Sequence, residues 1–252
     1  MNEILTINNL TKSFGENTIL NNISFSLKKG EVVVILGPSG CGKSTFLRCI
    51  NGLEKIDNGK ICLDGERIDD NKKILPKIRQ RIGMVFQSYD LFPHKNVMGN
   101  IILSPMKVQK RDKDEVVNEA RSLLKRVGLL EKEKSYERQL SGGQKQRVAI
   151  VRTLIMHPEI LLFDEVTAAL DPEMVREVLD VISELAKEGK TMLIVTHEME
   201  FARAVADRII FMDGGNIIED TTPEEFFTNP KTKRAREFIN TFHYEKDRKI
   251  AI

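Results

Sequence analysis

One stretch of the chain, EVVVILGPSGCGKSTFL at residues 31–47, constrains the fold more than any other. It begins with a continuous run of apolar, mostly β-branched residues, which is typical of a strand buried on both faces of a sheet. The glycine-rich residues 37–44 follow, and a short helical stretch then ends at Asn51-Gly52. A strand, a glycine-rich turn and a helix in direct succession predict an α/β core.

The turn itself predicts a phosphate site. Residues 37–44 match the pattern G-x-x-x-x-G-K-[ST], in which glycines let several backbone N–H groups point at phosphate oxygens. Lys43 adds a positive charge near the β- and γ-phosphates, and the Ser44 hydroxyl is placed to ligate Mg²⁺. A glycine-rich turn with an incidental lysine is the alternative, which the strand–turn–helix context disfavours. We therefore expect ATP to bind at Gly37, Pro38, Ser39, Gly40, Cys41, Gly42, Lys43, Ser44 and Thr45.

Composition places the chain among soluble intracellular proteins. Its net charge of +2 over 252 residues gives no strong field toward nucleic acid or anionic lipid. The longest apolar runs are strand-sized, and no signal-peptide-like segment opens the chain. The three cysteines, Cys41, Cys49 and Cys62, are odd in number and not spaced as metal ligands, so we expect reduced thiols.

The pattern along the chain predicts an α/β core interrupted by helices. Strand-like and helix-like segments alternate at the start and again after residue 158, whereas residues 88–158 are helical and highly charged. We expect a single domain over residues 1–252. Within it, residues 1–87 and 159–222 form the core, 88–158 a helical subdomain, and 223–252 a short helical tail.

Two carboxylates end the apolar run ILLFDE at residues 160–165. Neighbouring side chains on a strand point to opposite sides, so Asp164 and Glu165 should have different tasks. Asp164 suits coordination around Mg²⁺, and Glu165 suits orientation or deprotonation of the attacking water. Strands often end in charged residues, so this interpretation depends on the phosphate loop upstream.

A second glycine-rich helix opening, LSGGQKQR, lies at residues 140–147. It has no lysine placed to grip a phosphate within its own turn, and a plain helix N-cap would explain Ser141 but not two glycines, which weaken a helix. Together with the phosphate loop, MVFQ, LLFDE, ALD and IVTH, in that order and spacing, it resembles the ATP-binding cassette (ABC) ATPases. The resemblance covers roughly residues 4–220.

The resemblance implies a fold and a partner. ABC ATPases have a P-loop NTPase core, with a mixed sheet and an N-terminal antiparallel β part, and an inserted helical subdomain. Two cassettes associate head to tail, so the loop at Ser141, Gly142, Gly143 and Gln144 is expected to hold the ATP of a second subunit, a copy of this chain or a related one. A helix N-terminus suits a γ-phosphate there.

The resemblance also implies the remaining site residues. Phe14 matches the aromatic residue that stacks on adenine, although a lone phenylalanine near a strand usually belongs to a core. Gln87 matches the residue that reaches Mg²⁺ and the water, His197 the one that contacts the γ-phosphate, and Asp171 the loop that meets the partner. Catalytic roles are expected for Glu165, His197 and Gln87, and metal ligation for Ser44, Gln87 and Asp164.

Two positions depart from the family pattern. ABC ATPases commonly read D-E-P-T-S-A-L-D where this chain reads DEVTAALD. Val166 lacks the fixed φ of proline, and Ala168 lacks a hydroxyl that could hydrogen-bond across the dimer, a contact worth about 1 kcal/mol. Both bear on hydrolysis or coupling and not on ATP binding.

Residues 91–115 and 226–239 resemble bacterial polar amino acid importers. We therefore expect a peripheral ATPase on the cytoplasmic face of the inner membrane, with a permease contacting residues 87–94, Phe92, Pro93 and His94 among them. An extracytoplasmic solute-binding protein would act indirectly, and the permease and that receptor would choose the cargo. Exporters, lipoprotein release and soluble ABC machines are the alternatives. We expect no nucleic acid partner, because the basic run at residues 72–81 is better explained as a solvated face.

Overall fold

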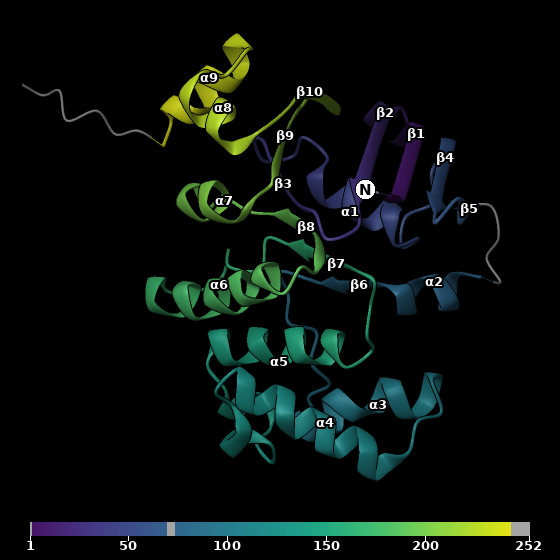
Figure 1. Cartoon of the computed structure of the whole chain (residues 1–252), viewed down its shortest axis with the longest axis vertical. Helices are drawn as coiled ribbons and strands as arrows, with labels where there is room; N and C mark the ends of the chain where they lie inside the picture. Colours follow the sequence, from purple (N-terminus) through teal and green to yellow (C-terminus); the bar gives the residue numbers. More distant parts are fainter. Residues whose placement is uncertain (1, 70–73, 243–252) are drawn as a thin grey trace, which may run out of the picture.

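A computed structural model describes residues 2–69 and 74–242, and its central feature is a mixed sheet (Figure 1). The strand order is β10-β9-β3-β8-β7-β6, with β10 antiparallel to β9 and the other pairs parallel. The strands are β3 (Val32–Leu36), β6 (Ile82–Val85), β7 (Ile160–Asp164), β8 (Thr191–Val195), β9 (Arg208–Asp213) and β10 (Asn216–Thr221). The sheet confirms the predicted α/β fold with a mixed sheet.

Both faces of this sheet are buried, as the apolar runs predict. Along β3, Val33 and Ile35 pack into one core cluster, whereas Val32, Val34 and Leu36 pack into the other. The alternation follows from the period of two in a strand. Helices and a second sheet must therefore cover opposite faces.

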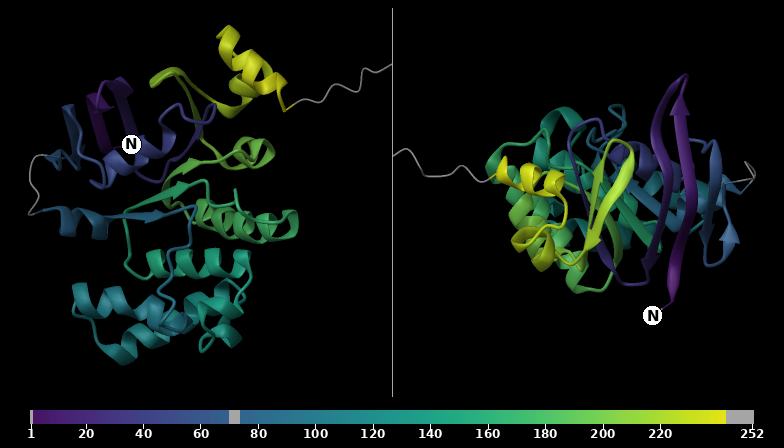
Figure 2. Two further views of the ribbon diagram at one scale, coloured as in Figure 1. Left: turned by 180° about the vertical axis from the view of Figure 1, so that it is seen from behind. Right: turned by 90° about the horizontal axis from the view of Figure 1, so that it is seen from above.

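The second sheet is antiparallel and covers one face. Its order is β2-β1-β4-β5, formed by β1 (Glu3–Phe14), β2 (Asn17–Lys28), β4 (Asn58–Leu63) and β5 (Glu66–Arg67). Helix α1 (Lys43–Ile50) lies between the sheets and buries Phe46 and Leu47. The rings of Phe25 and Phe46 meet edge to face at 5.7 Å. In the view from above, β1 and β2 lie on the side opposite the C-terminal helices (Figure 2).

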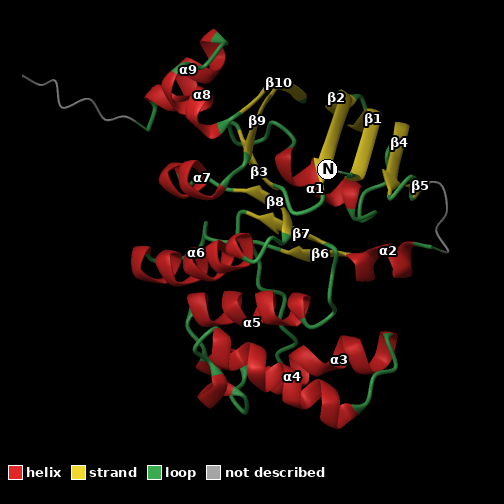
Figure 3. Cartoon of the chain, viewed as in Figure 1, coloured by secondary structure: helices red, strands yellow, loops and turns green. Residues whose placement is uncertain are grey.

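A helical block is inserted between β6 and β7 (Figure 3). It contains α3 (Val97–Val108), α4 (Lys113–Arg126), α5 (Gly142–Leu154) and two 3₁₀ turns (Leu130–Lys132 and Glu137–Gln139). Asp112 caps α4, and Val116, Ala120 and Leu124 are its buried stripe. The apolar residues of the block are continuous with the core cluster on one face of the sheet. The division of the chain into subdomains stays a prediction.

The remaining helices surround the sheet. They are α2 (Leu75–Arg81), α6 (Pro172–Lys187), α7 (Met199–Val205), α8 (Pro223–Thr228) and α9 (Lys233–Asn240). Within the predicted basic run, Arg79 donates to the Gly52 carbonyl and Arg81 pairs with Glu159 and Asp64, so these two side chains have structural partners. Residues 223–242 of the predicted tail form two helices, because Pro230 cannot continue the first, and residues 243–252 lie outside the described part of the chain. None of the helices formed by residues 2–69 and 74–242 is long and apolar enough to cross a membrane.

Candidate functional site

The phosphate loop has a backbone shape that requires glycine. Gly42, directly before α1, has φ +103°, in the left-handed region that favours glycine. At Gly37 an added Cβ would lie 2.2 Å from the backbone carbonyl oxygen of Met212. The loop between them connects the end of β3 to the N-terminus of α1, where free N–H groups favour an anion.

Lys43 is buried and bends back onto this loop. Its Nζ donates to the Gly37 carbonyl at 2.9 Å and the Pro38 carbonyl at 3.0 Å, and it lies 3.8 Å from Oε1 of Glu165. The loop borders a hollow of about 360 Å³ whose lining brings together many of the predicted residues. They are Phe14, Ser39, Gly40, Gly42, Lys43, Ser44, Thr45 and Glu165, with Ile19 in addition.

Phe14 stands at one side of this hollow, at the end of β1. Its ring is 47% exposed, so it is not the core residue that the alternative interpretation supposed. Nζ of Lys12 lies 4.6 Å from the ring centroid. Sequence reasoning missed Lys12, although residues two apart on a strand share a face, which would have indicated it.

Asp164 and Ser44 form the polar corner of the site. The Ser44 hydroxyl donates to Oδ1 of Asp164 at 2.6 Å. Burial raises the pKa of the Asp164 carboxyl, and the Ser44 hydrogen bond opposes this effect. A hydroxyl and a carboxylate side by side supply the oxygen ligands that Mg²⁺ prefers, so the donor set fits that ion.

Glu165 reaches the site by a route that the strand pattern does not predict. Strand β7 ends at Asp164, and Glu165 has φ +48°, outside the strand conformation. The two carboxylates therefore differ in direction because the backbone turns at Glu165, and the predicted alternation along a strand was the wrong reason. Its N–H donates to the carbonyl of Val195 at 3.0 Å, and its Oε1 lies 3.1 Å from Nε2 of His197. The His197 contact holds the pKa of the Glu165 carboxyl below its usual range, so the group is ionised at neutral pH.

Gln87 follows β6 and is exposed. It lines a wider hollow of about 690 Å³ together with Ser44, Asp164 and Pro93, so it faces the polar corner of the site. Phe92, predicted to meet a permease, is 41% exposed, and its ring centroid lies 5.9 Å from that of His94. The expected catalytic and docking residues therefore follow one another along a single segment.

The second glycine-rich turn begins α5 and does not line the phosphate hollow. Ser141 and Gln144 cap the helix reciprocally, with the Gln144 N–H donating to Ser141 Oγ at 3.3 Å and the Ser141 N–H donating to Gln144 Oε1 at 3.1 Å. The two glycines have a packing reason. A Cβ on Gly142 would lie 2.9 Å from both Leu170 Cδ2 and Tyr89 Oη, and one on Gly143 would lie 2.9 Å from Met174 Cβ.

That packing gives the paired glycines an explanation that the sequence argument, which compared only a helix N-cap with a ligand site, did not consider. Met174 packs closely against Gly143, and the ends of Leu170 and Tyr89 pack against Gly142, so contacts within the same chain already favour glycine at both positions. Asp171, at the N-terminus of α6, is exposed, as is Ala168, while Val166 is 5% exposed and belongs to the core. The valine at the proline position therefore has a packing role.

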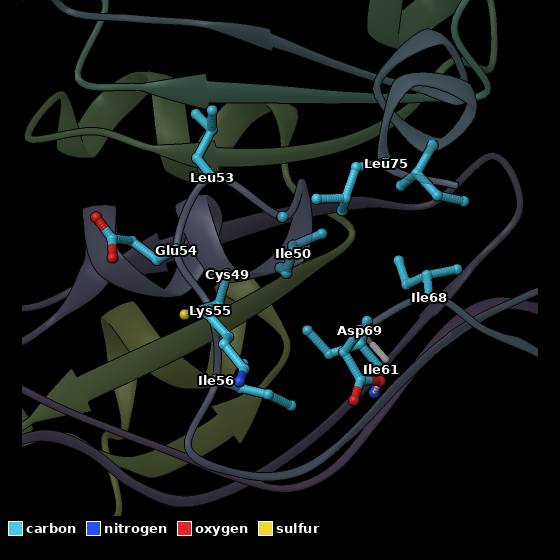
Figure 4. Close-up of a pocket in the computed structure, with 12 residues that line it drawn as sticks. Cys49, Ile50, Leu53, Glu54, Lys55, Ile56, Ile61, Ile68, Asp69 and Leu75 are labelled. Carbon is cyan, nitrogen blue, oxygen red and sulfur yellow. Dashed lines mark hydrogen bonds between the residues drawn. The ribbon is translucent and has the colours of Figure 1, made fainter. Parts of the chain in front are cut away.

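Another hollow, of about 260 Å³, lies near the C-terminal end of α1 and contains none of the predicted residues (Figure 4). Ile50, Ile61, Ile68 and Leu75 line it. Cys49 also lines it, and burial raises the pKa of its thiol to about 12, so the thiol is not a nucleophile at neutral pH. The three cysteines are free, as predicted.

Comparison with known proteins places this geometry in a family. The chain is 54% identical to the arginine transport ATP-binding protein of Bacillus subtilis, covering 94% of this chain and 98% of that protein. It is 52% identical to the glutamate/aspartate import ATP-binding protein of Escherichia coli K12, with the same coverage. A dimeric ATP-binding cassette solved with ADP and Pi is 34% identical, with a TM-score of 0.79 over 87% of this chain and 98% of that one. The sequence profile of the ABC transporter family matches residues 20–168, and the chain belongs to that family.

Proposed function

We propose that the chain is the ATP-hydrolysing subunit of an importer for polar amino acids. Relatives more than 50% identical along almost the whole chain are named for the import of amino acids, which supports this class of cargo. One relative is named for a cationic amino acid and another for anionic ones, at nearly equal identity. The ATPase chain would therefore not select the cargo, which the permease and its receptor would choose.

ATP would occupy the hollow between the phosphate loop and Phe14. The exposed Phe14 ring offers a flat face for adenine, and the loop N–H groups and Lys43 suit the phosphates. Mg²⁺, which neutralises phosphate charge when bound, would be held by Ser44 and Gln87, with Asp164 beside them. Pro38 and Cys41 would contribute through the backbone shape of the loop.

Glu165 would act on the attacking water. Its ionised carboxylate lies at the edge of the hollow, 3.8 Å from Lys43 and 3.1 Å from His197. A carboxylate fixed between two such groups can orient a water and accept its proton, while His197 keeps it in place. This arrangement of Lys43, Glu165 and His197 is the observation that carries the proposal.

A second cassette would complete each site. The capped turn at Ser141–Gln144 lies outside its own hollow, and Asp171 is exposed beside it, which suits contact with the ATP and surface of another copy. Residues 1–87 and 159–222 would form the nucleotide-binding core, 88–158 the helical subdomain and 223–252 the tail. A permease would contact residues 87–94 at the cytoplasmic face of the membrane, and an extracytoplasmic solute-binding protein would act through it.

Glu165→Gln tests the catalytic assignment. We expect ATP binding to persist while turnover falls by about 10²- to 10⁴-fold, because the amide cannot accept the proton. The variant should accumulate as an ATP-dependent dimer in analytical ultracentrifugation. Normal turnover by this variant would overturn the role of Glu165.

The same variant tests the transporter role. Tagged Glu165→Gln protein, incubated with ATP and Mg²⁺, is used to capture partners from detergent-solubilised native membranes, and mass spectrometry identifies them. We expect a multi-span membrane protein. Capture of soluble proteins or nucleic acid alone would instead favour an ABC machine outside transport.

A further inference from the structure

The aromatic ring that borders the phosphate hollow, that of Phe14, is itself in contact with a buried lysine. Nζ of Lys12 lies over the ring, 4.6 Å from its centroid. The two side chains differ in exposure, because Lys12 is 9% exposed and Phe14 is 47% exposed. Phe14 lines the hollow beside the phosphate loop, whereas Lys12 does not. An effect of Lys12 on a base in that hollow would therefore pass through the ring.

The ammonium group of Lys12 also pairs with two carboxylates. Oε2 of Glu54 lies 3.9 Å from Nζ, and Oδ1 of Asp57 lies 4.0 Å from it. Burying a cation is costly unless opposite charges compensate it, and these two carboxylates supply that compensation. The lysine head group is thus confined between two acidic side chains and one aromatic ring.

The segment that carries these carboxylates is tied to β1 on both sides of Lys12. The Asp57 N–H donates to the Thr11 carbonyl at 2.9 Å, and the Ser13 N–H donates to Oδ2 of Asp57 at 2.6 Å. The Glu54 N–H donates at 3.0 Å to a carbonyl of α1, the helix that follows the phosphate loop. The position of the lysine is therefore fixed relative to the phosphate loop as well as to its own strand.

A positive charge on one face of an aromatic ring changes what the ring can bind. The π system has a negative potential at its faces, which attracts a cation and repels a second electron-rich ring. The Lys12 ammonium offsets that potential, so an adenine base that stacks on the Phe14 ring meets less repulsion. The contact also restrains an exposed side chain, which lowers the entropy lost when a base orders it. Both effects act on the base, and neither acts on the phosphates.

We propose that Lys12 is a positioning residue for the base of the nucleotide. It does not touch the nucleotide, and it holds and polarises the Phe14 ring on which adenine stacks. Lys12 therefore adds to the affinity for ligands that carry the base and not to the affinity for base-free phosphates. This inference rests on the proposed function, because it requires adenine to lie on Phe14.

Titration calorimetry with two probes, ADP and inorganic pyrophosphate, each with Mg²⁺, tests the proposal. Pyrophosphate presents the same phosphate groups as ADP but has no base. Lys12→Met keeps most of the apolar stem and removes the charge. We expect it to weaken ADP binding by about 3- to 5-fold and to change pyrophosphate binding by less than about 1.5-fold. Lys12→Arg, whose guanidinium also lies well on an aromatic face, should keep most of the ADP affinity.

The same titrations in a Phe14→Leu background show whether the ring transmits the effect. Beside Phe14→Leu, Lys12→Met should change ADP affinity by less than about 1.5-fold, because the lysine then positions nothing. Lys60→Met is the matched control for the lost charge. Lys60 is an exposed lysine of the same sheet that pairs with Asn8, far from the Phe14 end of β1. This control should leave both affinities unchanged.

An equal loss of ADP and pyrophosphate affinity in Lys12→Met would overturn the proposal, since the lysine would then act on the phosphates or on the fold. A loss of the same size beside Phe14→Leu, or no loss of ADP affinity at all, would overturn it as well. Failure of the proposed adenine position is distinguishable, because Phe14→Leu alone would then leave ADP affinity unchanged. Pyrophosphate binding by each variant shows that its phosphate loop is folded.

Discussion

The phosphate loop, residues 37–44, and the second glycine-rich turn, residues 141–144, here called the signature turn, both open a helix, yet their glycines have different structural reasons. In the phosphate loop, Gly37 and Gly42 adopt left-handed φ values and leave a loop preshaped for an anion. In the signature turn, Gly142 and Gly143 are ordinary helical residues that make room for side chains of the same chain. One glycine set shapes the backbone, and the other allows close packing.

The difference extends to what each region can do alone. The phosphate loop already has a buried cation, Lys43, whose Nζ donates hydrogen bonds to carbonyls of the same loop. The signature turn has a reciprocal cap between Ser141 and Gln144 and no cation of its own within the turn. We infer that the first region binds nucleotide by itself, whereas the second acts only on a nucleotide that another subunit already holds.

The largest expected effect is on ATP affinity, and it should distinguish binding by the phosphate loop from action by the signature turn on a partner's nucleotide. Lys43→Met removes the charge and keeps the buried stem, so ATP affinity of the isolated subunit should fall by roughly 10- to 150-fold. Ser141→Arg should leave that affinity within about 2-fold, because the turn is outside the hollow, and should abolish turnover. Titration with a fluorescent ATP analogue at low protein concentration measures the first quantity. Equal loss of affinity in both variants would contradict the division of roles.

A second, smaller difference is expected in how much each glycine contributes to the stability of the fold. Gly37→Ala places a methyl group against the Met212 carbonyl, a backbone atom that cannot rotate away, and should destabilise the apo chain by about 3 kcal/mol or more. Gly142→Ala meets only the ends of Tyr89 and Leu170 and should cost about 1 kcal/mol. Tyr89→Phe, by removing the hydroxyl, should reduce that cost. Urea unfolding measures all three, and a Gly142→Ala cost as large as that of Gly37→Ala would mean that the signature backbone is also constrained.

Local signals predicted much of this fold. The apolar run before the phosphate loop is β3, and α3, α4 and α5 lie within residues 88–158, which the pattern predicted to be helical, because periodicity and end signals act over a few residues. Through resemblance to a family, the motif order also assigned site roles to Gln87 and His197, which no local pattern singles out, and those roles stay predictions.

Contacts between distant segments were not predictable. The position of β3 between β8 and β9 depends on pairing across more than 150 residues. The left-handed turn at Glu165 and the packing of Tyr89 on Gly142 likewise depend on neighbours far away in the chain. Sequence spacing fixes which residues are available, and tertiary packing decides which of them meet.

The smallest expected effect uses pH to distinguish the two regions. The pKa of the Asp164 carboxyl is raised in the folded chain, so its ionised form destabilises the apo fold. The penalty is fully present above that raised pKa and disappears as pH falls through it toward the unfolded value. Asp164→Asn should therefore raise the unfolding midpoint at neutral pH, by about 2–4 °C for each kcal/mol recovered, and the gain should shrink in acid.

The signature turn provides the matched control, because its cap has no ionisable group. Gln144→Ala removes half of the reciprocal cap, and its cost of about 0.5–1 kcal/mol should be the same at neutral and acidic pH. Thermal unfolding of the apo chain in the presence of a chelator measures both. A lower midpoint for Asp164→Asn at neutral pH would show that the buried carboxylate stabilises the empty site, and the charge cost assigned to the phosphate region would then be wrong. If the expected gain is found, burial of the ionised Asp164 carboxylate destabilises the apo chain, and bound Mg²⁺ would offset that cost. The signature turn has no ionisable group, so no bound cation would change its stability in the same way.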